Sequence, residues 1–132
     1  MNVLKVHLVL TFSLLLISLK SAADTAVSYG GDESLDACST LARVSHLSNG
    51  ADGFLAVKDS PNIKAKRVDK IFNDQSLWIC EESKDGNWLG IVYDSSEKKD
   101  CGVTTAIEKR RAYKGPCKSG WVSKKYVEPM AG

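Results

Sequence analysis

From residue 41 onward, short runs of β-forming residues alternate with turn signals, and this alternation limits the chain to folds built from short strands. The strongest hairpin signal is Asp85-Gly86, between the apolar runs LWIC (77–80) and WLGIVY (88–93). No window has a convincing helical period; TTAIEKRRA (104–112) comes nearest. The other expected strands are LARVSHL (41–47), FLAV (54–57), VDKIF (68–72), and the closing GWV (120–122) and YV (126–127). The pattern predicts an all-β fold, either a small barrel or a sandwich.

The first 23 residues have the features of a secretory signal peptide. Lys5 supplies a positive charge, residues 6–19 form an apolar run, and Ser21 and Ala23 are the small residues expected before a cleavage site. An uncleaved membrane anchor is the alternative, but the run is short for a hydrocarbon core that needs about 20 apolar residues. We therefore expect cleavage before Asp24 and a periplasmic or secreted protein.

After cleavage, the chain divides into a leader and one domain. Residues 24–37 are mostly polar, contain glycine and have no periodicity, which predicts a flexible leader. Residues 38–130 contain all the expected strands and have the length of a single small domain.

Four cysteines remain after the predicted cleavage: Cys38, Cys80, Cys101 and Cys117. An even number in an exported chain predicts two disulfides, although the sequence permits three pairings. Cys101 and Cys117 flank a segment rich in charged and turn residues, so we pair them with each other, and Cys38 with Cys80 follows by exclusion. There is no C-x-x-C pair, and His46 is the only histidine after residue 23, so we expect no metal site.

The charges of the chain are unevenly distributed. Residues 24–97 carry 7 basic and 13 acidic side chains, whereas residues 98–132 carry 9 basic and 3 acidic ones. This asymmetry could steer an acidic partner to one end of the molecule, or the two parts could face each other or simply be solvated. The exported location and the balance of charges after cleavage argue against a nucleic-acid partner.

Three segments resemble the bacterial SH3 domain family in order and spacing: DGFLAVKDSP (52–61), the hairpin LWIC…GNWLGIVY (77–93) and the closing SGWVSKKYV (119–127). Together with CGV (101–103) and GPCKSGWV (115–122), they are similar to a secreted, single-domain proteobacterial type. The resemblance covers about residues 44–127 and implies a small SH3-like barrel with a binding role. Two departures are Asp59-Ser60-Pro61 in place of Ser-Gly-Pro and an insertion between Cys101 and Cys117 that separates the hairpin from the closing strand.

Four aromatic residues are candidates for a peptide-binding groove: Trp88, Tyr93, Trp121 and Tyr126. Aromatic side chains bury a large area and keep a polar tip, so they suit grooves and cores alike. Trp121 and Val122 compete for the core, and a core position is favoured for Trp121 over a groove position. The hydroxyls of Tyr93 and Tyr126 require water or a partner.

The segment EKRRAYKGPCK (108–118) is the second candidate contact surface. Held by a disulfide, it would present Arg110 and Arg111 beside Tyr113, and a preorganised cationic surface binds with a lower ordering cost. Lys109, Lys114 and Lys118 add to its charge. The alternative is a solvated loop that keeps the protein soluble.

The sequence provides no recognisable catalytic residues and no cofactor motif. A nucleophile needs a base within hydrogen-bonding reach, and the cysteines are expected in disulfides. Glu81 and Glu82 are adjacent strand residues, so their carboxylates point to opposite faces. We expect a non-enzymatic module that binds peptidoglycan or its stem peptides, with no membrane contact after signal cleavage. The alternative is an inhibitor or immunity protein that binds a periplasmic enzyme or toxin.

Overall fold

The computed structural model describes residues 25–48 and 53–131. The predicted signal peptide (1–23) and residue 24 lie outside these residues. The described residues form nine strands and the short 3-10 helix η2, which confirms the all-β prediction. These elements are β1 (Ser28–Tyr29), β2 (Thr40–Val44), β3 (Leu55–Lys58), β4 (Arg67–Ile71), β5 (Ser76–Glu82), β6 (Trp88–Tyr93), β7 (Arg111–Ala112), β8 (Lys118–Ser123), η2 (Lys124–Tyr126) and β9 (Val127–Ala131).

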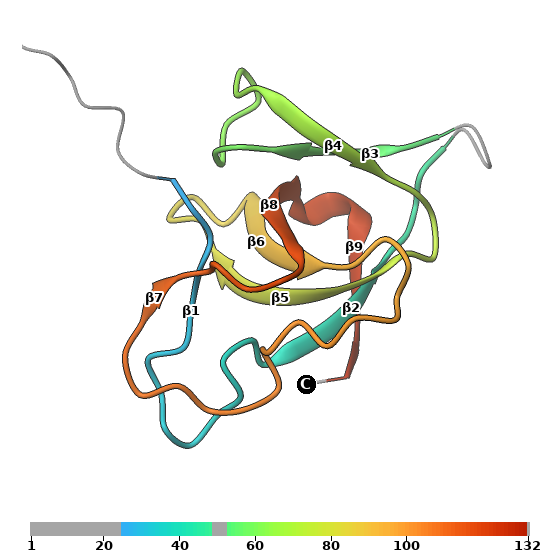
Figure 1. Cartoon of the computed structure of the whole chain (residues 1–132). Helices are drawn as coiled ribbons and strands as arrows, with labels where there is room; N and C mark the ends of the chain where they lie inside the picture. Colours follow the sequence, from blue (N-terminus) through green and yellow to red (C-terminus); the bar gives the residue numbers. More distant parts are fainter. Residues whose placement is uncertain (1–24, 49–52, 132) are drawn as a thin grey trace, which may run out of the picture.

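Seven antiparallel strands form one sheet in the order β4-β3-β8-β6-β5-β2-β9, and β1 pairs with β7 in a second sheet (Figure 1). We expected a small SH3-like barrel, but in the part of the chain that the structure describes β4 and β9 do not pair, so the sheet is open at these edges. Strand β3 aligns with β8 at a single position, Lys58 opposite Trp121. Because of this short contact, the β3–β4 hairpin turns away and crosses above the central strands (Figure 1).

The β5–β6 hairpin forms at the predicted Asp85-Gly86 turn, and β6 has the predicted bounds. The Asp85 carboxylate accepts hydrogen bonds from Ser83 Oγ (2.6 Å) and from the Asn87 amide (3.0 Å). Gly86 has a φ of 75°, in the left-handed region that glycine favours. The Ser83 amide donates to the Trp88 carbonyl at 2.9 Å, which closes the hairpin and fixes the start of β6.

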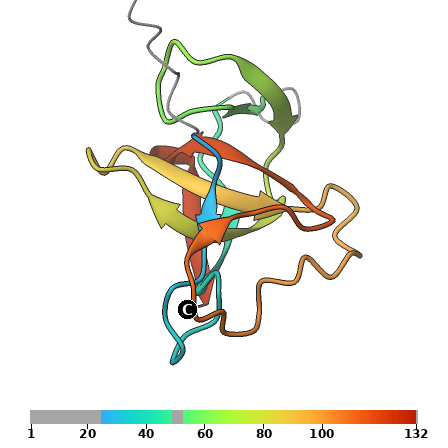
Figure 2. The ribbon, with the colours of Figure 1, turned by 60° about the vertical axis from the view of Figure 1, so that its left-hand side comes forward.

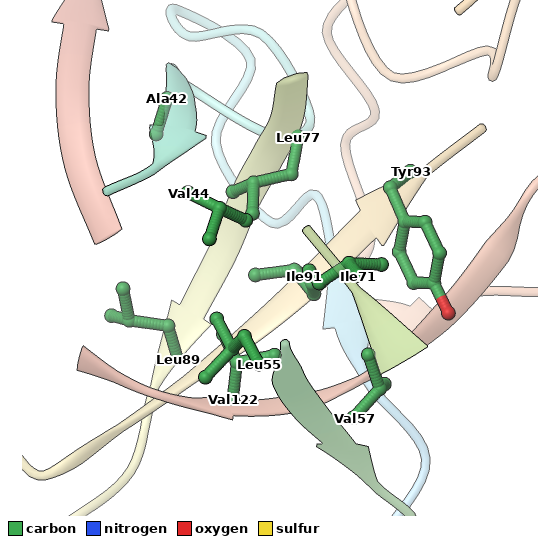
Figure 3. Packing of buried hydrophobic residues seen from close by; sticks show 10 residues of the cluster. All are labelled: Ala42, Val44, Leu55, Val57, Ile71, Leu77, Leu89, Ile91, Tyr93 and Val122. Carbon is green, nitrogen blue, oxygen red and sulfur yellow. The ribbon is translucent and has the colours of Figure 1, made fainter. Parts of the chain in front are cut away.

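The main hydrophobic core lies on one face of the central strands, under the β3–β4 hairpin (Figure 3). Along β6, alternate residues point into this core, as the period of two in a strand requires. The buried members are Ala42, Val44, Leu55, Val57, Ile71, Leu77, Leu89, Ile91, Tyr93 and Val122.

The opposite face of the central strands is covered by β1, β7 and the segments that connect them (Figure 2). Val92 points away from the main core and packs on this face with Tyr29 and Tyr113. Cys38 and Cys101, one cysteine from each disulfide, belong to the same cluster. The central strands are therefore covered on both sides, by β3–β4 on one face and by β1–β7 on the other.

The expected flexible leader (24–37) is wrong for residues 25–37, which belong to the fold. Val27 and Tyr29 are only 2% and 7% exposed, and the Gly30 amide donates to the Ala37 carbonyl at 2.9 Å. The Tyr113 amide donates to the Val27 carbonyl at 2.7 Å, which ties the segment to residues near β7. The segment is ordered by long-range burial rather than by a local pattern.

Both predicted disulfides form, Cys38–Cys80 and Cys101–Cys117. The first joins the chain just before β2 to β5, and the second closes the loop that carries β7. Residues 104–112, whose sequence has a weak helical pattern, form bends followed by β7 rather than a helix. Among the described residues, no helix has the length and apolar character to cross a membrane.

Candidate functional site

An open groove of about 580 Å³ lies between β3, the start of β6 and η2. Its walls are mainly apolar and carry the side chains of Phe54, Ile63, Trp88 and Tyr126. The remaining lining residues are Leu47, Ser48, Gly53, Leu55, Ala56, Lys58, Ser123 and Lys125. The sequence analysis predicted two of the four main residues, Trp88 and Tyr126.

Trp88 and Tyr126 come together because two backbone hydrogen bonds fix η2. The Lys124 amide donates to the Asn87 carbonyl at 3.0 Å, next to Trp88. The amide of Ser45, the residue after β2, donates to the Tyr126 carbonyl at 2.9 Å. This bond anchors the other end of η2. These hydrogen bonds fix the backbone next to Trp88 and at Tyr126.

Two lysines line the groove, and they make different contacts. Lys58 Nζ donates to the carbonyls of Ile63 and Ala65, both at 3.2 Å, and so shapes the loop that carries Ile63. Lys125 is exposed, and its Nζ lies 5.5 Å from the centre of the Tyr126 ring. Lys125 is therefore an exposed cation beside the aromatic wall of the groove.

The other two predicted groove aromatics, Tyr93 and Trp121, are buried and do not line this groove. Tyr93 is 1% exposed in the main core, and its hydroxyl donates to Asp69 Oδ2 at 2.7 Å. Trp121 is 6% exposed, and its indole N–H donates to the Thr25 carbonyl at 2.6 Å. Trp121 points away from the main core, where Val122 is buried, and is covered by the N-terminal segment.

The predicted basic surface is used largely for internal contacts. Arg110 forms an ion pair with Glu81, which also accepts the Ser28 amide at 2.9 Å. Arg111 lies over the Tyr29 ring, 5.5 Å from its centre, and donates to its hydroxyl. The contacts of Glu81 hold the β1–β7 layer against β5, and the Arg111–Tyr29 contact joins β7 to β1 within that layer.

Tyr113 also has a structural position. Its hydroxyl donates to the Cys101 carbonyl at 2.7 Å and accepts the Cys117 amide at 3.2 Å, within the loop that the second disulfide closes. Burial is the main cause that raises the pKa of Tyr113. We expected Tyr113 to lie at a cationic contact surface; it is instead 7% exposed and packs edge-on against Tyr29.

The two candidate surfaces lie on opposite sides of the central strands. The groove belongs to the side covered by β3, whereas the basic loop belongs to the β1–β7 layer. Arg110 and Arg111 do not line the groove, so the two candidate surfaces predicted from the sequence are separate.

Sequence reasoning missed Phe54 and Ile63 as groove residues. A period of two across FLAV would have separated Phe54 and Ala56 from the inward-facing Leu55 and Val57. Ile63 lies in a loop between turn residues, where no periodic signal exists.

Within residues 25–48 and 53–131, no group of three or more histidine, cysteine, aspartate or glutamate residues is arranged to hold a metal ion. Comparison with protein families, with curated proteins and with solved structures finds no match to this chain.

Proposed function

We propose that the protein is an exported, non-enzymatic binding module that holds a peptide in the groove formed by Phe54, Ile63, Trp88 and Tyr126. The observation that carries this proposal is the pairing of an open, apolar groove with two aromatic residues at which hydrogen bonds fix the backbone. Apolar pockets with a few well-placed polar groups are the usual form of binding sites in proteins. A preformed groove also reduces the ordering cost of binding.

The proposed ligand is peptidoglycan, through its stem peptides. Such peptides combine short apolar side chains, which suit the aromatic walls, with carboxylates, which suit Lys125. The resemblance to bacterial SH3 domains supports this ligand, because Tyr126 belongs to the segment GWVSKKYV on which the resemblance rests. The contacts of Arg110 with Glu81 and of Arg111 with Tyr29 favour the groove over the basic loop as the proposed binding surface.

The test is co-sedimentation of the chain from Asp24 onward with purified peptidoglycan sacculi, at low and at physiological salt. We expect pelleting that persists at physiological salt and weakens about tenfold in Tyr126→Ser, as for an aromatic residue central to an interface. Lys125→Glu should weaken binding as well. Circular dichroism must show that each variant is folded.

Two matched variants control for general effects. Phe72→Ser removes an exposed aromatic outside the groove, and Lys109→Glu reverses a charge on the opposite layer. If these controls weaken binding as much as the groove variants do, the groove is not the site. If the wild type does not pellet at either salt, the alternative function, inhibition of a periplasmic enzyme or toxin, replaces wall binding.

A further inference from the structure

Exposed apolar residues are concentrated on the β3–β4 hairpin and its loop. Among the described residues, six large apolar side chains are exposed, and four of them lie between residues 54 and 72. These four are Phe54 (39%), Ile63 (79%), Val68 (51%) and Phe72 (48%). Clustered exposure of this kind marks an interaction surface, whereas single exposed apolar residues need no explanation.

The same hairpin is a basic island in the acidic part of the chain. Of the seven basic residues in 24–97, five lie between residues 58 and 70. Lys64, Lys66, Arg67 and Lys70 are exposed. The hairpin thus combines apolar side chains with cations in a region whose other charges are mostly negative.

The strand register places Phe54, Phe72 and Lys70 on one surface. Leu55 pairs with Ile71, and both point into the core, so the next pair, Phe54 and Phe72, points outward. Lys70 Nζ lies 4.6 Å and Arg67 Cζ 5.3 Å from the centre of the Phe54 ring. We name Phe54, Ile63, Val68 and Phe72, with Lys64, Lys66, Arg67 and Lys70, the hairpin face.

The one carboxylate on β4 does not cancel this charge. Asp69 Oδ2 accepts hydrogen bonds from Tyr93 and, at 3.2 Å, from Lys118 Nζ. Burial raises the pKa of Asp69, but the hydrogen bonds from Tyr93, the Lys70 amide and Lys118 outweigh it and lower the pKa overall. Its negative charge is therefore directed to Lys118, and within residues 25–48 and 53–131 no carboxylate forms an ion pair with the cations of the hairpin face.

A second copy of the chain does not suit this surface. Strand β4 is an edge of the large sheet, and edge strands can pair with one another. Antiparallel pairing of two β4 strands, however, would bring Arg67 and Lys70 of one copy next to those of the other, and like charges on adjacent strands are destabilising.

We infer that the hairpin face binds the surface of a bilayer rich in anionic phospholipid. Ile63, Val68 and the two phenylalanines would enter the boundary between head groups and acyl chains. The four cations would contact the phosphates, where each lysine or arginine attracts an anionic membrane surface. This inference replaces our expectation of no membrane contact after signal cleavage, and it does not depend on the proposed wall-binding function.

The test uses vesicles of an equal mixture of phosphatidylglycerol and phosphatidylcholine, and vesicles of phosphatidylcholine alone. The chain from Asp24 onward, which contains all the described residues, should co-sediment with the anionic vesicles at low salt and much less with the neutral ones. Lys64→Glu with Lys66→Glu should reduce partitioning by at least about tenfold. Phe72→Ser should reduce it several-fold, because an inserted ring is lost.

Matched controls lie away from the hairpin face. Lys84→Glu reverses an exposed charge in the β5–β6 turn, and Leu35→Ser removes an exposed apolar side chain beyond β1; both should bind like the wild type. Absence of binding to anionic vesicles would overturn the inference. Loss in the charge variant together with full binding by Phe72→Ser would also overturn it, because binding would then be electrostatic adsorption without insertion of the apolar side chains.

The two proposals fail separately. Phe72 and Val68 do not line the groove, so Phe72→Ser should lose vesicle binding and keep sacculus binding. Tyr126→Ser should do the reverse.

Discussion

Tyr93 and Asp69 join β6 to the edge strand β4 through one partly buried hydrogen bond of 2.7 Å. Burial is the main cause that raises the pKa of Tyr93, and the neighbouring Asp69 raises it further. A raised folded-state pKa means that the native state holds its proton more tightly than the unfolded chain. The stabilisation is therefore complete below about pH 10, the ordinary tyrosine value, and is lost as the pH rises above it.

We expect Tyr93 to stay protonated in the native protein at about pH 11, above the ordinary tyrosine value. Ultraviolet titration at the tyrosinate band measures this directly. Tyr93→Phe should leave the native titration unchanged up to that pH and should lower the free energy of unfolding by about 1–3 kcal/mol, because Asp69 loses a donor. A smaller titration amplitude in Tyr93→Phe below about pH 11 would show that Tyr93 ionises in the folded state.

Whether a single side chain belongs to the core was predictable only where one face of its strand is exposed. Residues in β6 and β8 alternate between two buried faces, so parity alone does not separate Trp121 from Val122 as core residues. Gly120 is a related case, because another strand approaches it closely. A Cβ on Gly120 would lie 2.4 Å from Val57 Cγ1, where β3 crosses β8.

At the scale of elements, Arg110 connects the segment next to β7 with β5 and β1. The Arg110 guanidinium is half exposed, but its partner Glu81 is mostly buried and also holds the Ser28 amide. Arg110 therefore stabilises the docking of β1 as well as forming an ion pair.

Arg110→Glu should lower the free energy of unfolding by about 1 kcal/mol, since it replaces an ion pair with two carboxylates side by side. Urea denaturation of the disulfide-bonded protein measures the change. Lys109→Glu, which alters an exposed neighbour, is the matched control and should leave the midpoint unchanged. Equal urea midpoints for Arg110→Glu and Lys109→Glu would show that Arg110 is a solvated loop residue.

Elements with local signals were predicted well, and those ordered by distant partners were not. The strands β3 to β6 and β8 follow runs of β-forming residues, and the β5–β6 turn follows from Asp85-Gly86. Strands β1 and β7 have two residues each and exist because they pair with each other. The groove shows the same division: Trp88 and Tyr126 belong to recognisable segments, whereas Ile63 depends on the path of a loop.

For the molecule as a whole, the N-terminal segment covers one face of the central strands. Val27 and Tyr29 are buried there, and a Cβ on Gly90 would lie 3.1 Å from Val27 Cγ1. The Thr25 carbonyl accepts the Trp121 indole N–H. The N-terminal segment thus covers Trp121 and β6.

A chain that begins at Gly31 should be less stable than one that begins at Thr25, by about 3 kcal/mol or more. This is the order expected for the loss of two buried apolar side chains. Urea denaturation followed by tryptophan fluorescence measures the difference, and the native emission should shift to the red as Trp121 meets water. Identical midpoints and emission would restore the flexible-leader prediction.

The strand pairing also has a consequence for the time at which the fold is completed. β1 pairs with β7, and β2 pairs with both β5 and β9, so the earliest strands of the chain wait for partners near its end. A chain exported from its N-terminus therefore cannot finish its sheet until β9 has emerged, and non-local pairing of this kind is slow. In the export that we propose, Cys38 and Cys80 would reach the oxidising compartment before Cys101 and Cys117. The Cys38–Cys80 bond would then connect the chain before β2 to β5 while β9 is still in transit, and the order of oxidation would follow the order of export.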